Sequence, residues 1–427
     1  MNKTIWNEID SDNYEKLSSN ISTDVLVIGG GICGILCAYR LAKEKKNVIL
    51  VEQNRIGGIK TRKTTAVITA LQDLLYSDLV NTLGYEKARL YLESTLMAIN
   101  EYKSLALEYD FDFEEVSSYK YSLSDTSVLI KEMAALRDLG YRAYYHENIN
   151  LPLNVNGAIE FKNQVQINPL KLIDKLKNEF KIYENTKIVK IYENNAITKE
   201  GFKISANNII VCSGYPFLKM KGMFPLKQYQ EKSYVVAIKN ESGFNGNVIG
   251  LNKDDLYFRS YKDYLIIGDN QTRTGNNING FNRLEKYVKE VYNTKILYKW
   301  INQDCVTLDS IPYIGKYGSF DNVYVCTGFN LWGMTGAMIS SVLMCDYILK
   351  RDNKLFELFS TNRKINIGNA IKNTATAAKG LLSPGGKRCK HLGCKLKWNE
   401  LDKTYECPCH GSKYDIDGKL LEGPSLK

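Results

Sequence analysis

The stretch DVLVIGGGICGILCAYRLAKEKKNVILVEQ, residues 24–53, decides the fold of the first part of the chain. Residues 24–28 are a short apolar run of the kind that forms a buried parallel strand, and the segment after residue 34 has a helical pattern. A second apolar run then ends at Glu52. A strand, a helix and a second strand in this order predict a βαβ unit and an α/β fold.

The glycines between the first strand and the helix have the spacing of a dinucleotide-binding loop. Gly29 permits a tight turn, Gly31 lets the backbone approach a pyrophosphate, and Gly34 lets the helix pack closely on the strand. The helix N-terminus offers N–H groups to phosphates, and Glu52 is placed to accept hydrogen bonds from ribose hydroxyls. An ordinary glycine turn is the alternative, and the loop alone does not distinguish NAD from FAD.

A second signal lies near the C-terminus, where four of the ten Cys and two of the three His are clustered. They form the pairs Cys389-x-His391 and Cys407-x-x-His410, with Cys394 and Cys409 beside them. Two thiolates and two imidazoles suit either a zinc ion or an iron–sulfur cluster. The residue types alone leave both possibilities open.

The two C-terminal segments, CKHLGC at 389–394 and CPCHGS at 407–412, closely resemble the ligand loops of Rieske proteins, and Gly423-Pro424 resembles their third loop. The resemblance implies a [2Fe–2S] cluster, with Cys389 and Cys407 on one iron and His391 and His410 on the other. It also implies a disulfide between Cys394 and Cys409. Few residues flank these loops, so we expect a minimal domain that depends on the rest of the chain for its fold.

The first 350 residues resemble the D-amino-acid-oxidase-like (DAO) superfamily of flavoenzymes, which includes glycine and sarcosine oxidases. The likeness rests on the loop at 29–34, on IIVCSG at 209–214, on DSIPYIG at 309–315 and on a segment ending GFNLWGMT at 335. It implies FAD, with a helix after Gly333 directed at the N1/C2=O edge of the flavin. The FAD-binding residues implied in this way are Gly29, Gly30, Gly31, Gly34, Glu52, Gln53, Thr64, Thr65, Val189, Ser213, Gly214, Gly328, Gly333, Met334 and Thr335.

Together these signals predict three parts. Residues 1–350 are expected to form a Rossmann-like FAD-binding domain (about 20–75, 165–225 and 300–350) interleaved with an antiparallel-sheet substrate domain (about 76–164 and 226–299). Residues 351–386 are expected to be a polar linker, and residues 387–427 a small all-β Rieske domain.

Composition narrows the possible partners and location. The net charge is +10, but Lys is spread along the chain without a block of like charges, which predicts no nucleic-acid binding. An acidic redox partner is the alternative explanation of this charge. Polar residues interrupt the apolar stretch 328–349, so we expect a buried helix and no membrane span. We expect a cytoplasmic protein whose other six Cys are buried thiols.

Two functions follow from the resemblance. The first is a dehydrogenase that oxidises an amine or amino acid and passes electrons singly through the cluster to an external acceptor. The second is a redox sensor or assembly protein without steady turnover. A Rieske oxygenase is excluded, because its mononuclear iron needs two further His and only His146 remains.

Candidates for the substrate site are less well supported. Arg259 lies where some family members place a carboxylate-binding Arg, and a guanidinium suits a carboxylate. Tyr257 and Trp332 are candidates for the pocket walls. Each of the three residues has a plain alternative as a surface or core side chain.

Overall fold

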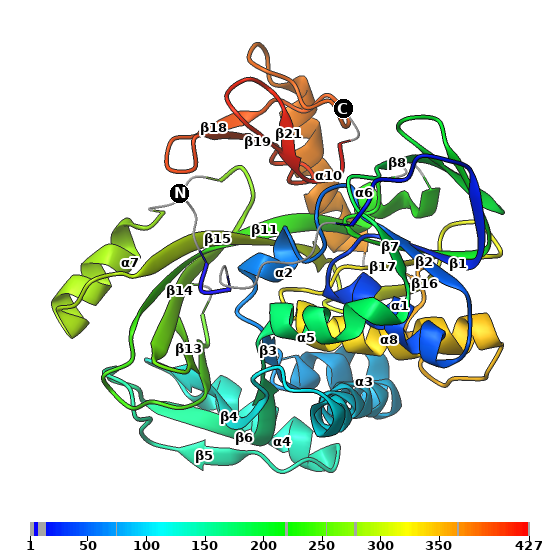
Figure 1. Cartoon of the computed structure of the whole chain (residues 1–427). Helices are drawn as coiled ribbons and strands as arrows, with labels where there is room; N and C mark the ends of the chain where they lie inside the picture. The colour runs from blue at the N-terminus through cyan, green and yellow to red at the C-terminus, as the bar shows by residue number, and fades with distance from the viewer. Residues whose placement is uncertain are drawn as a thin grey trace.

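The computed structural model describes residues 4–6, 14–73, 75–217, 221–252, 254–276, 280–364 and 367–425. Two large sheets form the body of the molecule, and a small third sheet lies on top of them (Figure 1). The expected fold class, an α/β flavin-type body with a second sheet and a small all-β unit, is confirmed.

The first large sheet is built around parallel strands in the order β16-β17-β10-β1-β2-β7, with the β8–β9 hairpin joined through β10. Side chains of β1 alternate between its two faces: Val25 and Val27 pack on helices, whereas Leu26 and Ile28 pack against the β8–β9 side. Both faces are therefore buried, which explains the continuous apolar run in the sequence. Its strands are β1 (Ile21–Ile28), β2 (Val48–Val51), β7 (Lys181–Tyr183), β8 (Ile188–Tyr192), β9 (Asn195–Thr198), β10 (Lys203–Gly214), β16 (Tyr313–Lys316) and β17 (Val323–Thr327).

Helices cover one face of this sheet (Figure 1). They are α1 (Ile32–Lys43), α3 (Tyr76–Glu108), α5 (Pro169–Leu176) and α8 (Gly333–Leu349). The Asn168 side chain caps α5, because it accepts hydrogen bonds from the N–H groups of Leu170 and Lys171, with Pro169 in the first turn. The apolar stretch before residue 350 is the buried helix α8, as expected.

The second large sheet has the order β15-β11-β14-β13-β12-β4-β6-β3, with β5 paired to β6. Strand β11 is buried along almost its whole length. The C-terminal unit covers the face that carries Gln230 and Lys232, which is why polar side chains there are buried. The strands are β3 (Val67–Ile68), β4 (Glu114–Ser122), β5 (Tyr144–His146), β6 (Gly157–Gln166), β11 (Gln228–Lys239), β12 (Asn247–Gly250), β13 (Tyr257–Tyr261), β14 (Tyr264–Arg273) and β15 (Tyr298–Thr307).

Shorter helices complete the body: α2 (Lys60–Lys63), α4 (Ser127–Asp138), α6 (Phe224–Lys227), α7 (Asn282–Tyr287) and α9 (Phe356–Phe359). Residues 351–386, expected as a linker, contain α9 and also α10 (Ile367–Leu382). The segment after α10 forms the third sheet, β18 (Lys397–Asn399), β19 (Thr404–Glu406), β20 (Lys413–Tyr414) and β21 (Leu420–Glu422). Helix α9 packs on the body, where Leu358 and Phe359 join the buried core, whereas α10 packs on Cys394 and Cys409 of the C-terminal unit.

The six other cysteines are buried, as expected, but they are not scattered. Cys33 and Cys37 of α1 meet Cys212 of β10 and Cys326 of β17, with all four sulfur atoms within 4.8 Å of one another. The pKa of Cys37 and that of Cys212 are raised, largely through the neighbouring thiols and burial. Protonated thiols of this kind pack as small apolar side chains between helix and sheet.

Candidate functional site

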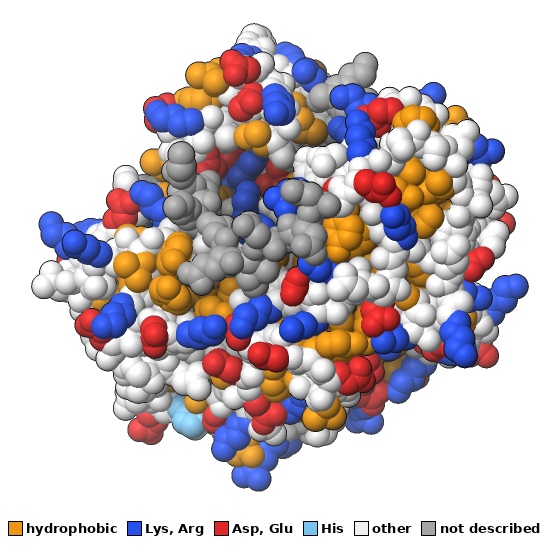
Figure 2. All heavy atoms as spheres, in the orientation of Figure 1, with side chains coloured by type: hydrophobic (Ala, Val, Ile, Leu, Met, Phe, Trp, Pro, Cys, Tyr) orange, Lys and Arg blue, Asp and Glu red, His pale blue; other side chains and the backbone are white. Residues whose placement is uncertain are grey.

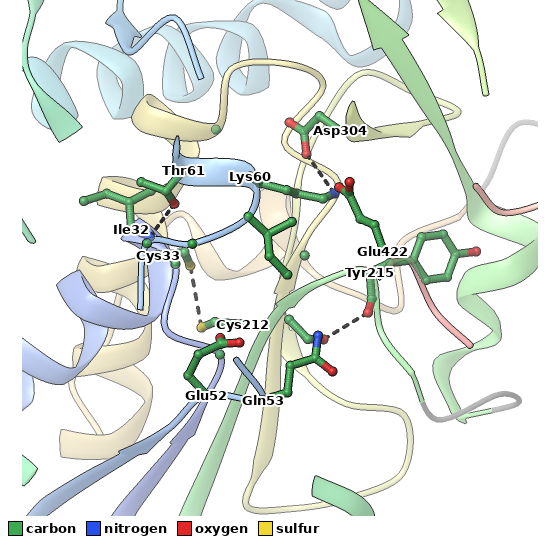
Figure 3. Close-up of a pocket in the computed structure, with 18 of the residues that line it drawn as sticks. Ile32, Cys33, Glu52, Gln53, Lys60, Thr61, Cys212, Tyr215, Asp304 and Glu422 are labelled. Atoms are coloured by element: carbon green, nitrogen blue, oxygen red, sulfur yellow. Dashed lines mark hydrogen bonds and ion pairs between the residues drawn. The ribbon is translucent and has the colours of Figure 1, made fainter. Parts of the chain in front are cut away.

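A deep cavity opens where the carboxyl ends of β1, β2 and β10 meet α2, β15 and the C-terminal unit (Figure 3). Ligands of open α/β sheets bind at this edge. Among the residues predicted to bind FAD, the cavity wall includes Gly29, Gly31, Glu52, Gln53, Thr64, Ser213, Gly214, Gly333 and Met334. The others lie outside this wall: Gly30, Gly34, Thr65, Val189, Gly328 and Thr335.

The glycine loop at the cavity floor leaves no room for side chains at two positions. Gly29 has a φ of +115°, and a Cβ there would lie 2.6 Å from the carbonyl oxygen of Cys212. A Cβ on Gly34 would lie 1.9 Å from the carbonyl oxygen of Gly29. The loop therefore brings backbone directly to the cavity and packs α1 tightly on β1, which is the geometry a pyrophosphate requires.

Glu52 is held in place by this loop. One carboxylate oxygen accepts a hydrogen bond from the N–H of Gly30 and the other from the N–H of Asn54, both at 2.8 Å. Burial raises the pKa of Glu52. Each oxygen keeps a second lone pair on the cavity side, so the residue fits a role as acceptor for ribose hydroxyls.

The other end of the cavity holds a polar group that sequence reasoning missed. The Nζ atom of Lys60 lies 3.5 Å from Asp304 Oδ1 and 3.2 Å from Gln230 Oε1, and Glu422 of the C-terminal unit points toward it (Figure 3). Burial disfavours the ammonium form of Lys60, but nearby Cys305, Asp304 and Glu422 outweigh it and raise the pKa. These residues come from four distant segments of the sequence, so no local sequence motif predicts that they meet.

The three candidates for the substrate site do not line this cavity. Arg259 is 1% exposed, and its guanidinium donates hydrogen bonds to Gln166 Oε1 and the carbonyl oxygen of Ile167. The ring of Trp6 lies 5.3 Å from that guanidinium and covers it. Arg259 is thus a buried cation outside the cavity wall.

Tyr257 and Trp332 are also occupied elsewhere. Tyr257 packs over Gly268 and its hydroxyl lies 3.3 Å from that of Ser233. Trp332 caps the start of α8, where its N–H donates to the carbonyl oxygen of Phe329. Phe329, Leu331 and Met334, from the same turn, line the cavity in place of Trp332.

The four predicted cluster ligands meet in the C-terminal unit and are all buried. Cys389 and Cys407 interact through their thiols, and the rings of His391 and His410 lie 5.0 Å apart. Burial lowers the pKa of His410 to about 3, so its ring is neutral and able to bind metal. Its Nε2 faces the carbonyl oxygen of Pro225 at 3.2 Å, which leaves Nδ1 for a metal. Two thiols and two imidazoles fit a [2Fe–2S] cluster.

The expected disulfide between Cys394 and Cys409 is present and ties the two ligand loops together. Both sulfur atoms lie against α10, at 3.9 and 3.8 Å from the carbonyl oxygen of Ala377. A Cβ on Gly380 would lie 2.8 Å from Cys409 Sγ. Helix α10 is thus packed directly onto the cross-link.

The histidine side of this unit faces the flavin-type body. Tyr215, which follows β10 and lines the cavity, has its ring 6.4 Å from that of His391 and 6.1 Å from that of His410. Gln230 donates a hydrogen bond to the carbonyl oxygen of His410, and Gln303 donates one to that of Gly411. One aromatic ring therefore lies between the cavity and both predicted histidine ligands.

Buried charges fix the unit in this position. Lys232 of β11 and Glu406 of β19 form an ion pair at 2.7 Å, with both side chains fully buried. Burial lowers the pKa of Lys232, whereas Lys413 and Lys232 outweigh burial and lower that of Glu406. Arg273 of β14 donates hydrogen bonds to the carbonyl oxygens of Pro408 and Cys409. Separation of the two units would break this ion pair and both backbone hydrogen bonds of Arg273.

Comparison with known proteins agrees with this arrangement. The model of the FAD dependent oxidoreductase family DAO matches residues 24–347, and that of the Rieske [2Fe-2S] domain matches residues 371–427. A protein described as a Rieske 2Fe-2S iron-sulfur protein, YhfW of Bacillus subtilis strain 168, is 30% identical over 100% of this chain and 96% of its own length.

Solved structures share the fold of the body. Glycine oxidase from Geobacillus kaustophilus has a TM-score of 0.68 at 17% identity and covers 81% of this chain and 100% of its own. L-proline dehydrogenase from P. horikoshii has a TM-score of 0.66 at 17% identity and covers 81% of this chain and 98% of its own. The DAO domain of this chain binds FAD, and the Rieske domain binds a [2Fe–2S] cluster.

Among the described residues, no helix combines the length and hydropathy that crossing a bilayer requires. The cytoplasmic location expected from the sequence stays a prediction.

Proposed function

We propose that this chain, which belongs to the DAO family of FAD-dependent oxidoreductases and ends in a Rieske domain, is a dehydrogenase acting on an amine or amino acid. Its electrons would leave singly through the Rieske cluster to an external acceptor. When bound, FAD would accept a hydride from the substrate C–H bond next to nitrogen, and the cluster would supply one-electron transfer. The contribution of the protein lies in positioning these two groups and closing the space between them.

The observation that carries the proposal is the position of Tyr215. Tyr215 belongs to the cavity wall, and its ring lies edge-on to the rings of His391 and His410. The FAD-binding cavity and the metal-binding loops are therefore separated by about one aromatic side chain at this point. A path this short supports electron transfer within one chain.

Closure of the cavity by the Rieske domain supports the same proposal. Glu422, Gly423 and Ser425 form part of the cavity wall, beside Lys60 and Tyr215. Glu422 also pairs with Lys63 of α2 at 3.5 Å. Covering this end of the cavity restricts the access of water and oxygen to it. We therefore expect a poor oxidase and a good dehydrogenase.

Both sets of ligands are assigned within this proposal. We infer that FAD lies along the cavity residues from Gly29 and Glu52 to Gly333 and Met334. We infer that Cys389 and Cys407 bind one iron and that His391 and His410 bind the other. Cys305, enclosed by the cavity wall with a pKa raised to about 12 by burial, is inferred not to anchor the flavin covalently.

The substrate class rests on Lys60. The structurally similar proteins are named for glycine and L-proline, both amino acids. Three cations line the cavity: Arg55, Lys60 and Lys187. With Arg259 engaged elsewhere, we infer that Lys60 is the one that a substrate carboxylate meets, because Asp304 lies beside it and would attract an amine. We therefore expect an amino acid or amine small enough to approach Lys60.

A screen of amino acids and their decarboxylated amines for anaerobic bleaching of the flavin tests the proposal. Bleaching by a set of related compounds is expected, and its absence across both classes would contradict a dehydrogenase. Lys60→Met should raise KM for a carboxylate-bearing substrate more than for its amine partner. Lys203→Met, at an exposed position of β10, is the matched control and should leave both unchanged.

A further inference from the structure

We propose that the external acceptor is a small acidic protein carrying a one-electron group, and that it docks on a basic surface over the disulfide of the Rieske domain. The surface, called here the basic face, consists of Lys379, Leu381 and Leu382 of α10, Lys387 and Arg388 of the following turn, and Lys390 of the first ligand loop. The inference rests on the proposed function, because it names the partner of the same electron path.

The histidine side of the cluster is closed to any outside partner. His391 is 2% exposed and His410 is 3% exposed, because the flavin-type body covers both rings. Tyr215 and the carbonyl oxygen of Pro225 occupy the space in front of them. An acceptor must therefore approach the cluster from another direction.

Another side of the ligand loops is covered by α10. Ala377 and Gly380 of α10 lie on the Cys394–Cys409 disulfide, which ties the two ligand loops. An α-helix is about 10–12 Å across with its side chains. A partner resting on the outer side of α10 would thus lie roughly one helix diameter from the disulfide, and Lys390 stands between the ligands Cys389 and His391.

The basic face is one continuous surface. The Arg388 guanidinium donates hydrogen bonds to the carbonyl oxygens of Leu381, Ser383 and Gly393, which joins α10, the turn and the ligand loop. Lys387 donates to the carbonyl oxygen of Ile416, which is itself 63% exposed. The acidic residues Asp415 and Asp417 flank Ile416 in the sequence.

Apolar side chains project from the middle of this surface. Leu382 is 83% exposed and Leu381 is 45% exposed. Exposed leucines with a charged border have the composition of a protein-binding patch: an apolar centre that excludes water and a rim that steers the partner. A small patch of this kind suits the brief, weak encounters of electron-transfer proteins.

The distribution of charged residues along the chain indicates an acidic partner. The chain has no Asp or Glu between Glu357 and Glu400, whereas its basic residues there are Arg363, Lys364, Lys372, Lys379, Lys387, Arg388, Lys390, Lys395 and Lys397. On the face shown in Figure 2, by contrast, basic and acidic side chains are interspersed. The excess of positive charge is thus concentrated around the cluster, where it attracts an acidic surface and raises the rate of encounter.

The test begins with chemically reduced full-length protein, so that it does not depend on substrate oxidation. Stopped-flow mixing with an oxidised acidic blue-copper protein, or with a basic c-type cytochrome, follows the colour of each acceptor over a range of salt concentrations. The double variant Lys379→Glu/Lys390→Glu reverses charge on the basic face. Lys203→Glu/Lys239→Glu, at exposed positions of β10 and β11, is the matched control.

We expect the acidic acceptor to react faster at low salt and the double variant to slow it by on the order of tenfold or more, with the difference vanishing at high salt. Leu382→Asn should slow it at every salt concentration, while EPR shows an intact cluster in each variant. Equal rates for variant and control would overturn the proposal, as would preference for the basic acceptor. Salt-dependent binding to anionic vesicles without reaction with the acidic protein would overturn it too. If the acidic acceptor is reduced as expected but no amine bleaches the flavin, the surface stands and the proposed function fails.

Discussion

The flavin-type body and the Rieske domain are stabilised in different ways. The body has two large sheets and three extended clusters of buried apolar side chains. The buried cluster of the Rieske domain contains Leu396 and Tyr414, but its other members are the cysteines Cys389, Cys394, Cys407 and Cys409. Four of its six members are therefore the disulfide and the predicted iron ligands.

The stability of the small domain therefore depends on the cluster that it binds and on its contacts with the body. Domains of this size bury too little apolar surface to be stable alone and rely on metals, disulfides or neighbours. Here the cluster, the disulfide and the buried contacts to Lys232, Arg273 and Tyr215 take the place of a larger core. The body needs none of them, so damage to the small domain should leave FAD binding intact.

The largest effect should follow removal of a cluster ligand. Wild-type protein should contain iron and acid-labile sulfide at about two per chain. Cys389→Ser or His410→Ala should lose the cluster, because a [2Fe–2S] centre needs all four ligands, and should keep the flavin. Metal and sulfide analysis with the visible spectrum measures both. Zinc without sulfide, or loss of flavin together with the cluster, would break the contrast between the two regions.

Removing one partner of the buried ion pair should have the next largest effect. Lys232→Met removes a buried cation that compensates the charge of Glu406 in an interface without water. Removal of one partner of a buried ion pair costs about 3–5 kcal/mol of stability. We expect the Rieske domain to loosen first, seen as protease cleavage in residues 383–386 and a lower midpoint for loss of the cluster bands. Lys239→Met, at the exposed end of the same strand, is the control. Unchanged cleavage in Lys232→Met would mean that docking does not depend on this pair.

Crowding the disulfide should have a smaller effect. Gly380→Ala places a Cβ 2.8 Å from Cys409 Sγ, so α10 must shift, at a cost of about 1–3 kcal/mol in the stability of the Rieske domain. Thr374→Ala, on an exposed turn of the same helix, should change stability by less than about 0.5 kcal/mol. Thermal loss of the cluster bands compares the two variants. Equal stability would show that α10 is not packed tightly on the disulfide.

The smallest effect concerns pH. Lys63, Lys413 and Lys60 outweigh burial and lower the pKa of Glu422 in the folded protein. A carboxyl with a lowered pKa contributes stability above its unfolded value of about 4.3, and this contribution is lost as the pH falls through the folded value. The stability difference between wild type and Glu422→Gln should be about 1 kcal/mol and flat from pH 8 to 6, and should shrink below about pH 4. A difference that changes near neutral pH would contradict this assignment.

The sequence was informative where function depends on neighbouring residues. The loop at Gly29–Gly34 and the two ligand loops are local, so their residues could be identified from the sequence, and the resemblance of the ligand loops to Rieske proteins implied the Cys394–Cys409 cross-link. Lys60 and Asp304 meet only through tertiary contacts, and a lone Lys in a loop carries no signal. Arg259 has the residue type of a carboxylate ligand, but its burial depends on Trp6, far away in the chain. The sequence did not predict α10, because its segment is polar. The helix packs on the disulfide, which lies elsewhere in the sequence.

The central claim is that FAD and the cluster act in series through the contact at Tyr215. Anaerobic stopped-flow reduction with an active substrate, followed by EPR of frozen samples, tests it most directly. The account predicts that bleaching of the flavin is followed by loss of the oxidised cluster bands and by a reduced-cluster signal. Tyr215→Phe should preserve this second phase and Tyr215→Leu should slow it, since Tyr215 meets both histidines through ring contacts and its hydroxyl has no hydrogen-bond partner among the described residues. A cluster that stays oxidised beside fully reduced flavin, even after long incubation, would contradict the account.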